Sequence, residues 1–238
     1  PSDQRSILDI QRLDRQATSL RHKASILPEL AELASTTVKA NNARDLRIAA
    51  ETELSDVKRE LARAEGDVEQ IVTRIERDEK RLSSGTGTPK ELEQTQHELV
   101  TLGARRAELE EVELEIMMRV DAIKERIADL SGQENQLALE IADLNIRKEN
   151  ALAAIHTELE GIEADRKSTT QSVSADFLAL YEKIREGNNG IGAAALAGNQ
   201  CKGCNLTLNT IELQRIAGLA EDEVVRCEEC RCILVRER

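Results

Sequence analysis

Apolar residues recur along most of the chain at alternating steps of four and three positions. One row runs through Leu13, Ala17, Leu20, Ala24, Leu27, Ala31, Ala34 and Val38. A similar row runs from Leu54 to Leu82. A mean step of about 3.5 keeps one stripe of a helix facing a partner helix, which is typical of a coiled coil. Between the rows, Asn41, Asn42 and Asp45 fall near the seam, so we expect a local irregularity there.

A short polar segment at residues 83–90 ends the first predicted helix, which covers about residues 4–83. Its two glycines and Pro89 cannot continue a helix, whereas Thr88 followed by Pro89 is a favourable helix start. The segment therefore predicts a sharp connection between two helices.

The apolar row resumes after this connection and predicts a second long helix. It runs from Leu92 to Ile184, with a slip expected near Ile116, and the glycines and asparagines of residues 187–190 end it. Two long helices joined by a short break are expected to fold back as an antiparallel hairpin. Because the second helix is longer, its last stretch, near residues 169–184, should need cover from the N-terminus or from the C-terminal segment. A parallel homodimeric coiled coil is the alternative, but its rod would have to contain the glycines and the proline.

The composition favours long narrow helices over one large globular core. The 238 residues include one Phe, one Tyr and no Trp, although aromatic side chains normally supply much of a core's buried area. Charged residues make up 33%, and the regular apolar spacing argues against disorder. The net charge of −12 argues against a protein that grips nucleic acid through its bulk surface. No apolar run approaches a membrane span, and the first residues lack a secretion-signal layout, so we expect a cytoplasmic protein.

The residues show no catalytic constellation. His22, His97 and His156 lie far apart, and none has a cysteine or a second histidine at ligand spacing. The many carboxylates are those expected on solvated helix faces, where they pair with basic residues one turn away. We therefore expect a protein that is not an enzyme.

Four of the five cysteines form two C-x-x-C pairs, Cys201 with Cys204 and Cys227 with Cys230. Each pair makes a tight knuckle with both sulfurs on one side, and two facing knuckles suit tetrahedral Zn²⁺ at ~2.3 Å per bond. The alternative is two redox dithiols, but neither pair lies between a strand and a helix. Four thiolates leave no open position, so the sequence predicts one structural Zn²⁺ ion.

Residues 188–238 are expected to form a small β-structured zinc ribbon, separate from a hairpin domain over residues 1–187. Few large apolar side chains are available there, so the metal is needed for stability. Strands are expected at residues 193–197, 205–208, 223–226 and 233–235, and a short helix at 210–216 with Ile211, Leu213 and Ile216 facing inward. Asn205 and Arg231 follow the knuckles, where a positive φ is frequent.

The fifth cysteine, Cys232, follows the second knuckle and has three interpretations. It could replace Cys230 as a ligand, act as a reactive thiol, or be an ordinary strand residue. We favour the strand residue, because the C-x-x-C spacing already satisfies the metal.

Three motifs are informative together: PKELEQTQHELVTL (89–102), CKGCNLTL (201–208) and CEECRCILV (227–235). In combination they resemble the bacterial C4-type zinc-ribbon proteins with an N-terminal coiled coil. PKELEQTQHELVTL (89–102) looks like that family's Pro-Lys-Glu-Leu tip motif and its Gln-His-Glu sequence. CKGCNLTL (201–208) and CEECRCILV (227–235) match its two knuckles, although the family more often has Gly before the final Ile-Leu pair. The resemblance implies a coiled-coil hairpin with a terminal zinc ribbon. Its members are described as nucleic-acid-binding or regulatory proteins, some of them linked to transcription and flagellar regulation.

Two functions follow from these observations. The first is an adaptor, whose hairpin and ribbon bind protein partners and neither a membrane nor a small-molecule substrate. The alternative is an RNA- or DNA-binding protein that uses the ribbon. Arg226, Arg231, Arg236 and Arg238 could gather on one face, but Glu228 and Glu229 would repel phosphate, and the ribbon has no aromatic side chain on which a base could stack. We therefore favour the adaptor.

Overall fold

The computed structural model describes residues 2–236 of the chain. The elements are α1 (Ser2–Ser25), α2 (Pro28–Ser84), α3 (Pro89–Thr170), α4 (Ala175–Gly187), β1 (Ala193–Ala197), β2 (Gln200–Cys201), α5 (Thr210–Ala217), β3 (Val225–Arg226) and β4 (Ile233–Arg236). They form two compact units, one of Glu32–Leu144 and one of Pro1–Ala31 with Asn145–Arg238. The domain boundary expected between residues 187 and 188 remains a prediction.

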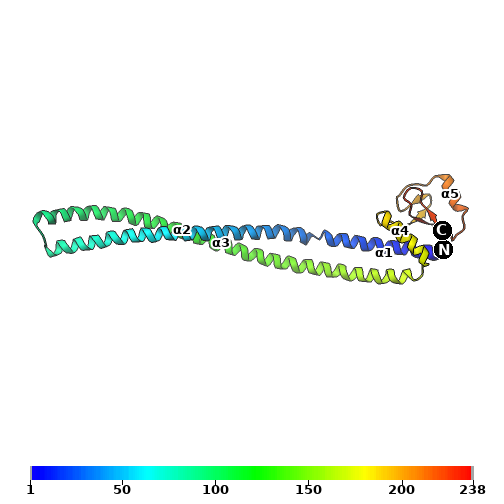
Figure 1. Ribbon diagram of the computed structural model, residues 1–238, viewed down its shortest axis with the longest axis horizontal. Helices are drawn as coiled ribbons and strands as arrows, with labels where there is room; N and C mark the ends of the chain where they lie inside the picture. Colours follow the sequence, from blue (N-terminus) through cyan, green and yellow to red (C-terminus); the bar gives the residue numbers. More distant parts are fainter. Residues whose placement is uncertain (1, 237–238) are drawn as a thin grey trace. The chain divides into compact units, whose positions relative to one another are not determined.

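In the unit of residues 32–144, α2 and α3 run side by side and join at a tight tip (Figure 1). Ion pairs between the helices give the direction. Arg47 of α2 pairs with Glu134 of α3 at 2.5 Å, whereas Glu60, further along α2, pairs with the earlier Arg119 at 2.8 Å. The pairing partners move in opposite directions along the two helices, so the packing is antiparallel. The antiparallel hairpin is therefore confirmed, and it forms within one chain.

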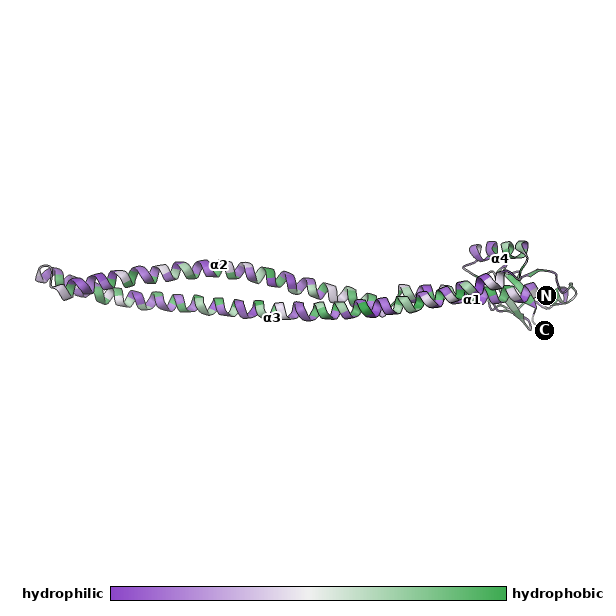
Figure 2. Cartoon of the chain, turned by 90° about the horizontal axis from the view of Figure 1, so that it is seen from below, coloured by the Kyte–Doolittle hydropathy of each residue, from purple (hydrophilic) through white to green (hydrophobic). Residues whose placement is uncertain are grey.

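The seam of this hairpin follows a heptad on both helices. The buried α2 residues include Thr36, Ala43, Ala50, Val57 and Ala64, and the buried α3 residues include Ile116, Val120, Ile123, Leu130 and Leu144. Apolar and polar residues alternate along both helices in the hydropathy colouring (Figure 2). The expected slip near Ile116 is wrong, because this residue lies in an unbroken seam.

A break between α1 and α2 was not predicted, and it shifts the first apolar row. Pro28 begins α2, and a proline disfavours helical geometry at the preceding residue, here Leu27. The single helix expected over residues 4–83 is therefore wrong. Because the break changes the helix phase, Thr36 is buried while Val38, which was expected in the seam, is 58% exposed.

The tip at residues 85–88 has the predicted glycine turn and the predicted helix start. Gly85 and Gly87 have positive φ, and α3 begins with a reciprocal cap between Thr88 and Glu91. The Thr88 amide donates to Glu91 Oε2 at 2.8 Å, and the Glu91 amide donates to Thr88 Oγ1 at 3.3 Å. This is a capping box, which satisfies two amides that the helix leaves unpaired.

The second long helix is also broken, at residues 171–174, and the prediction of one continuous helix is wrong there. The Thr169 hydroxyl donates to the Asp165 carbonyl at 2.8 Å, and the Ser172 hydroxyl donates to the Thr169 carbonyl at 2.7 Å. Hydroxyl groups that compete for backbone carbonyls in this way weaken a helix. The chain then continues as α4, whose N-cap is Ser174.

The end of the helical region, now α4, is covered both by the N-terminal helix α1 and by the C-terminal sheet. Tyr181 and Ile184 of α4 share one core with Ile7 and Ile10 of α1 and with sheet residues that include Ile233. The prediction that the end of the helical region needs cover is therefore confirmed. Within this unit, α1, α4 and the sheet form a common core.

The four strands form one sheet in the order β2-β1-β4-β3, with β1 and β4 parallel at its centre and both outer pairs antiparallel. The strand expected at residues 205–208 is reduced to one bridge, between Gln200 and Thr207. The expected short helix is present as α5, but Ile211 is 80% exposed and does not face inward. In the described part of the chain, no helix is long and apolar enough to cross a membrane.

Candidate metal centre

The two C-x-x-C segments fold into knuckles with the same backbone pattern. In the first, the Asn205 amide donates to the Cys201 carbonyl at 2.8 Å, and in the second, the Arg231 amide donates to the Cys227 carbonyl at 3.0 Å. Asn205 has φ 60° and Arg231 has φ 61°, as predicted. Asparagine tolerates this conformation, whereas at arginine it costs about 1 kcal/mol.

The knuckles bring four sulfurs together. The ligand atoms of Cys201, Cys204, Cys227 and Cys230 all lie within 4.8 Å of one another. Cys201 Sγ lies 3.8 Å from Cys230 Sγ, and Cys204 Sγ lies 3.9 Å from Cys227 Sγ. A tetrahedron with ~2.3 Å Zn–S bonds has edges of about 3.8 Å, so the donor type and the spacing fit a four-coordinate zinc ion.

Burial disfavours the thiolate form of these cysteines while no cation is bound. Burial raises the pKa of the Cys227 thiol to about 12, and burial also raises the pKa of Cys204. Burial acts in the same direction at Cys230, but hydrogen bonds from the Cys232 backbone and from the neighbouring thiols of Cys232, Cys227 and Cys204 together outweigh it and lower the pKa. Thiols with raised pKa values stay neutral unless a cation is present, and a coordinating thiol is deprotonated.

Cys232 lies directly beside this cluster. Its sulfur is 3.3 Å from Cys230 Sγ and 3.8 Å from Cys201 Sγ, and its side chain is fully buried. Its carbonyl accepts a hydrogen bond from the Cys227 amide at 3.0 Å. It immediately precedes β4, so its backbone position agrees with the strand-residue interpretation, but its side chain belongs to a group of five thiols.

A glutamine of α1 holds the start of the C-terminal module, the sheet and cysteine knuckles of residues 188–236. Gln11 Oε1 accepts hydrogen bonds from the Gly192 and Ala193 amides at 2.7 and 3.1 Å, and Gln11 Nε2 donates to the Gly190 carbonyl at 3.0 Å. No local sequence pattern indicates this contact, because it joins residues about 180 positions apart. Gln11 therefore fixes the start of β1, and with it the chain that leads into the first knuckle.

A buried carboxylate next to Gln11 joins three helices. Asp14 of α1 accepts a hydrogen bond from the Tyr181 hydroxyl at 2.7 Å and from Arg166 Nε of α3 at 2.6 Å. Arg185 of α4 lies 3.3 Å from the same carboxylate. Burial and the Asp14 carboxylate raise the pKa of the Tyr181 hydroxyl, so Tyr181 remains a neutral donor. The group is structural, and sequence spacing could not have revealed it.

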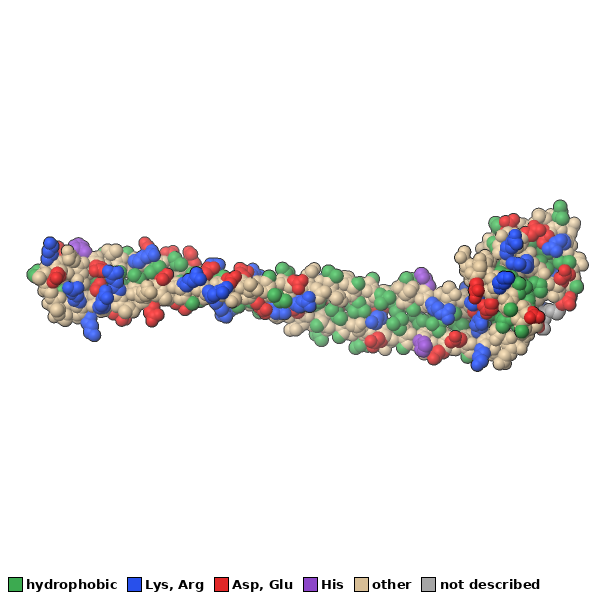
Figure 3. Space-filling view, viewed as in Figure 1, with side chains coloured by type: hydrophobic (Ala, Val, Ile, Leu, Met, Phe, Trp, Pro, Cys, Tyr) green, Lys and Arg blue, Asp and Glu red, His purple; other side chains and the backbone are tan. Residues whose placement is uncertain are grey.

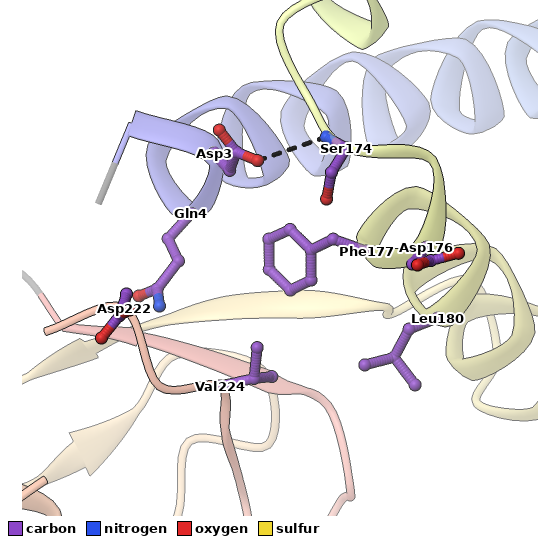
Figure 4. Close-up of a pocket in the computed structure, with 8 residues that line it drawn as sticks. All are labelled: Asp3, Gln4, Ser174, Asp176, Phe177, Leu180, Asp222 and Val224. Carbon is purple, nitrogen blue, oxygen red and sulfur yellow. Dashed lines mark hydrogen bonds between the residues drawn. The ribbon is translucent and has the colours of Figure 1, made fainter. Parts of the chain in front are cut away.

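A cleft of about 530 Å³ opens beside this core and was also missed. Phe177 lies at its centre, with Leu180 and Val224 completing an apolar floor (Figure 4). Asp176 and Asp222 are exposed residues at its rim. Asp3, Gln4 and Ser174 complete the lining, and the Asp3 carboxylate accepts a hydrogen bond from the Ser174 amide at 3.2 Å.

The arginines considered for nucleic acid do not form one free patch. The guanidinium of Arg236 donates to the carbonyls of Ile216 and Leu219 at 3.1 Å each, which holds it against the last turn of α5 and the segment that follows. Arg226 Nε donates to the Arg231 carbonyl at 2.9 Å, and Arg238 lies outside the described residues. Acidic and basic side chains are intermixed over the visible face of the molecule (Figure 3).

Comparison with known proteins assigns the helical region to a family. The family model of the CT398-like coiled coil hairpin domain matches residues 10–189. The chain belongs to this family. The hairpin part of the resemblance inferred from the motifs is thereby confirmed.

Relatives of the CT398-like chain extend over its whole length. An uncharacterized Mycobacterium tuberculosis protein, Rv2229c, is 34% identical over 99% of this chain and 96% of its own length. A solved Mycobacterium smegmatis structure has a TM-score of 0.84 at 28% identity, covering 99% of this chain and 98% of that one. The structure of CT398 from Chlamydia trachomatis, with a TM-score of 0.69 at 18% identity and the same coverage, shows the shared fold.

Proposed function

We propose that this CT398-like protein is a non-enzymatic adaptor of the reducing cytoplasm. One structural zinc ion holds its C-terminal module, and the module together with the helices binds protein partners. The observation that carries the proposal is the cleft around Phe177, which combines an apolar floor with an acidic rim. Such a surface suits a protein segment with an apolar anchor and basic neighbours.

The zinc ion has a structural part in this proposal. Cys201, Cys204, Cys227 and Cys230 would hold it, and four thiolates leave no position for a reactive water. When bound, the ion would cross-link the two knuckles. The core around them is small, with side chains such as Ala194, so metal binding and folding of the module are coupled.

The cleft favours protein over nucleic acid on electrostatic grounds. The rim residues Asp176 and Asp222 would repel phosphate, whereas they attract lysine or arginine side chains. The floor residues Phe177 and Val224 can bury an apolar anchor, as the centres of protein interfaces commonly do. Val224 is 40% exposed, so its side chain is accessible from the cleft.

An outward-facing apolar row on α3 supports partner binding by the hairpin as well. Val100, Ala104, Ala107, Leu114 and Met118 follow one another at helical spacing, and all of them are exposed. Val100 is 75% exposed and Met118 is 64% exposed, although buried seam residues of the same helix already contact α2. A second row of this kind suits recognition of another helix.

Nucleic-acid binding remains a second candidate because of one further cleft. Lys183, Arg226 and Arg231 help to line about 440 Å³ beside the second knuckle, where Glu229 contributes an opposing charge. Three cations facing one carboxylate could hold a phosphate group. The four-thiolate zinc centre would add negative charge next to this cleft, so we rank this function second.

Affinity capture from a native cytoplasmic extract tests the two functions against each other. Wild type, Val224→Lys and Val38→Lys would each be used with and without nuclease, followed by identification of bound protein and RNA. Val38 is an exposed valine that does not line the cleft, so it provides the matched control. We expect a defined protein set that survives nuclease, is retained by Val38→Lys and is lost with Val224→Lys.

Two results would contradict the adaptor. Equal capture by all three proteins would exclude the Phe177 cleft as the binding surface. Enrichment that collapses with nuclease, with specific RNA or DNA recovered, would establish the second candidate. A further variant, Arg231→Glu, would then be expected to lose that nucleic acid.

A further inference from the structure

The five-thiol group contains one sulfur more than a tetrahedral zinc site uses. The contact between Cys230 Sγ and Cys232 Sγ is 3.3 Å, which is shorter than the edge of about 3.8 Å between two sulfurs on one zinc ion. The two sulfurs therefore do not have the spacing of two ligands of the same ion. Their separation is instead that of two thiols in direct contact.

The two cysteines differ in their access to solvent. Cys230 is only partly buried and lines the open cleft that also contains Lys183 and Arg226. Cys232 is fully buried. A Cβ at Gly203 would stand 3.2 Å from Cys232 Sγ, so the backbone of the first knuckle closely covers this sulfur. An oxidant can thus reach Cys230 from the cleft but cannot reach Cys232 directly.

We propose that Cys230 and Cys232 form a peroxide-sensitive thiol pair whose oxidation releases the metal. Cys230 is the sulfur that reacts with a hydroperoxide, and Cys232 is the sulfur that resolves the product. The proposal rests on metal binding at the four-cysteine site and adds regulation to it.

The reaction has two steps, and its atoms balance. The Cys230 thiolate attacks the peroxide, the O–O bond breaks, and Cys230 sulfenic acid forms while the departing oxygen takes a solvent proton, which gives water from hydrogen peroxide or an alcohol from an organic hydroperoxide. The Cys232 thiol then attacks the Cys230 sulfur, the S–O bond breaks, and water leaves. Two sulfurs lose two electrons in total, and the hydroperoxide gains them. The second knuckle has then lost a ligand, because a disulfide sulfur is not a thiolate.

The experiment compares reduced, zinc-loaded wild type with Cys232→Ala and Cys232→Ser. After addition of hydrogen peroxide, a colorimetric chelator follows zinc release, and tryptic peptides are mapped without reduction. Trypsin cleaves after Arg226 and Arg231, so Cys232 lies on a different peptide from Cys227 and Cys230, and fragmentation of the joined peptides identifies which of the two is bonded to Cys232. Cleavage after Lys202 likewise separates Cys201 from Cys204.

We expect both variants to bind one zinc equivalent and to release it at least about tenfold more slowly than wild type, because a neighbouring thiol captures the sulfenic acid at high effective concentration. The linked Cys230–Cys232 peptides should appear in wild type alone. Unchanged release rates in the variants, or a wild-type map without this link, would overturn the proposal.

Loss of zinc from both untreated variants would also overturn it, because Cys232 would then be required for the metal site itself. Absence of zinc from wild type is a different result and would contradict the proposed metal centre. In that case the disulfide map of the metal-free protein still tests the thiol pair, so the two failures can be distinguished.

Discussion

Replacement of Asp14 by alanine should loosen the unit that carries the metal centre. The Asp14 carboxylate is 7% exposed and lies where α1, α3 and α4 meet. It accepts hydrogen bonds from Tyr181 and Arg166, and it lies 3.3 Å from Arg185. The substitution removes the acceptor while all three donors remain.

The expected loss of unfolding free energy depends on which hydrogen-bond partners remain for each donor after the substitution. The buried Tyr181 hydroxyl loses its short bond and keeps a 3.4 Å contact to Gln11, which costs about 1–3 kcal/mol. Arg166 and Arg185 are 26% and 31% exposed and both still reach Glu182, so they lose less than the ~3–5 kcal/mol of a fully buried pair. The total loss of unfolding free energy is about 2–4 kcal/mol, which lowers the urea midpoint by about 1–2 M.

The assay uses the chain's own probe. Tyr181 is the single tyrosine and the chain has no tryptophan, so intrinsic fluorescence reports this unit during urea unfolding. Asp9→Ala is the matched control, because Asp9 lies on the same helix with its side chain 58% exposed. Its substitution should cost at most about 0.5 kcal/mol. If Asp14→Ala and Asp9→Ala gave the same midpoint, the structural role of the buried carboxylate would be refuted.

Three further predictions concern the metal site and the hairpin. Cys204→Ser should lose zinc and unfold the C-terminal module while the helical circular dichroism stays near normal; retention of one zinc per chain would contradict the ligand set. Asp78→Leu should raise the stability of the hairpin by about 1–3 kcal/mol, because Asp78 is 7% exposed and its Oδ2 has no hydrogen-bond partner in the described structure; a lower melting temperature by circular dichroism would contradict this. The pKa of Glu91 lies below its ordinary value because the Thr88 amide and hydroxyl donate to its carboxylate, so the cap is fully formed above the ordinary glutamate pKa of about 4.3 and is lost as pH falls through the lower folded value. Hydrogen exchange at the Thr88 amide measures this. After correction for the pH dependence of the intrinsic exchange rate, its protection should fall as pH falls below about 4.3, and constant protection would contradict the cap.

Local patterns predicted much of the fold. The heptad spacing and the Gly-Thr-Gly-Thr-Pro segment predicted the hairpin and its tip, because coiled-coil packing and helix termination depend on neighbouring residues. The spacing of Cys201, Cys204, Cys227 and Cys230 likewise predicted a cluster of four sulfurs. The positive φ at Arg231 followed from the repeated geometry of the knuckles.

Features that depend on distant contacts could not be predicted in the same way. The break before Pro28 was hidden because the apolar row continues through Leu27 and Ala31 with regular spacing. The hydrogen bonds of Gln11 and the cleft around Phe177 join residues brought together only by the fold. The contact between Cys232 and Cys230 depends on side-chain direction, which sequence spacing does not determine.

The most direct test of protein binding at the Phe177 cleft is photo-cross-linking in cells from a benzophenone amino acid at position 224, with position 38 as the control. We expect cross-links from position 224 to one defined set of proteins, through segments rich in lysine, arginine and apolar residues, and no such set from position 38. Cross-links from position 224 to nucleic acid alone, or the same products from both positions, would contradict the adaptor function.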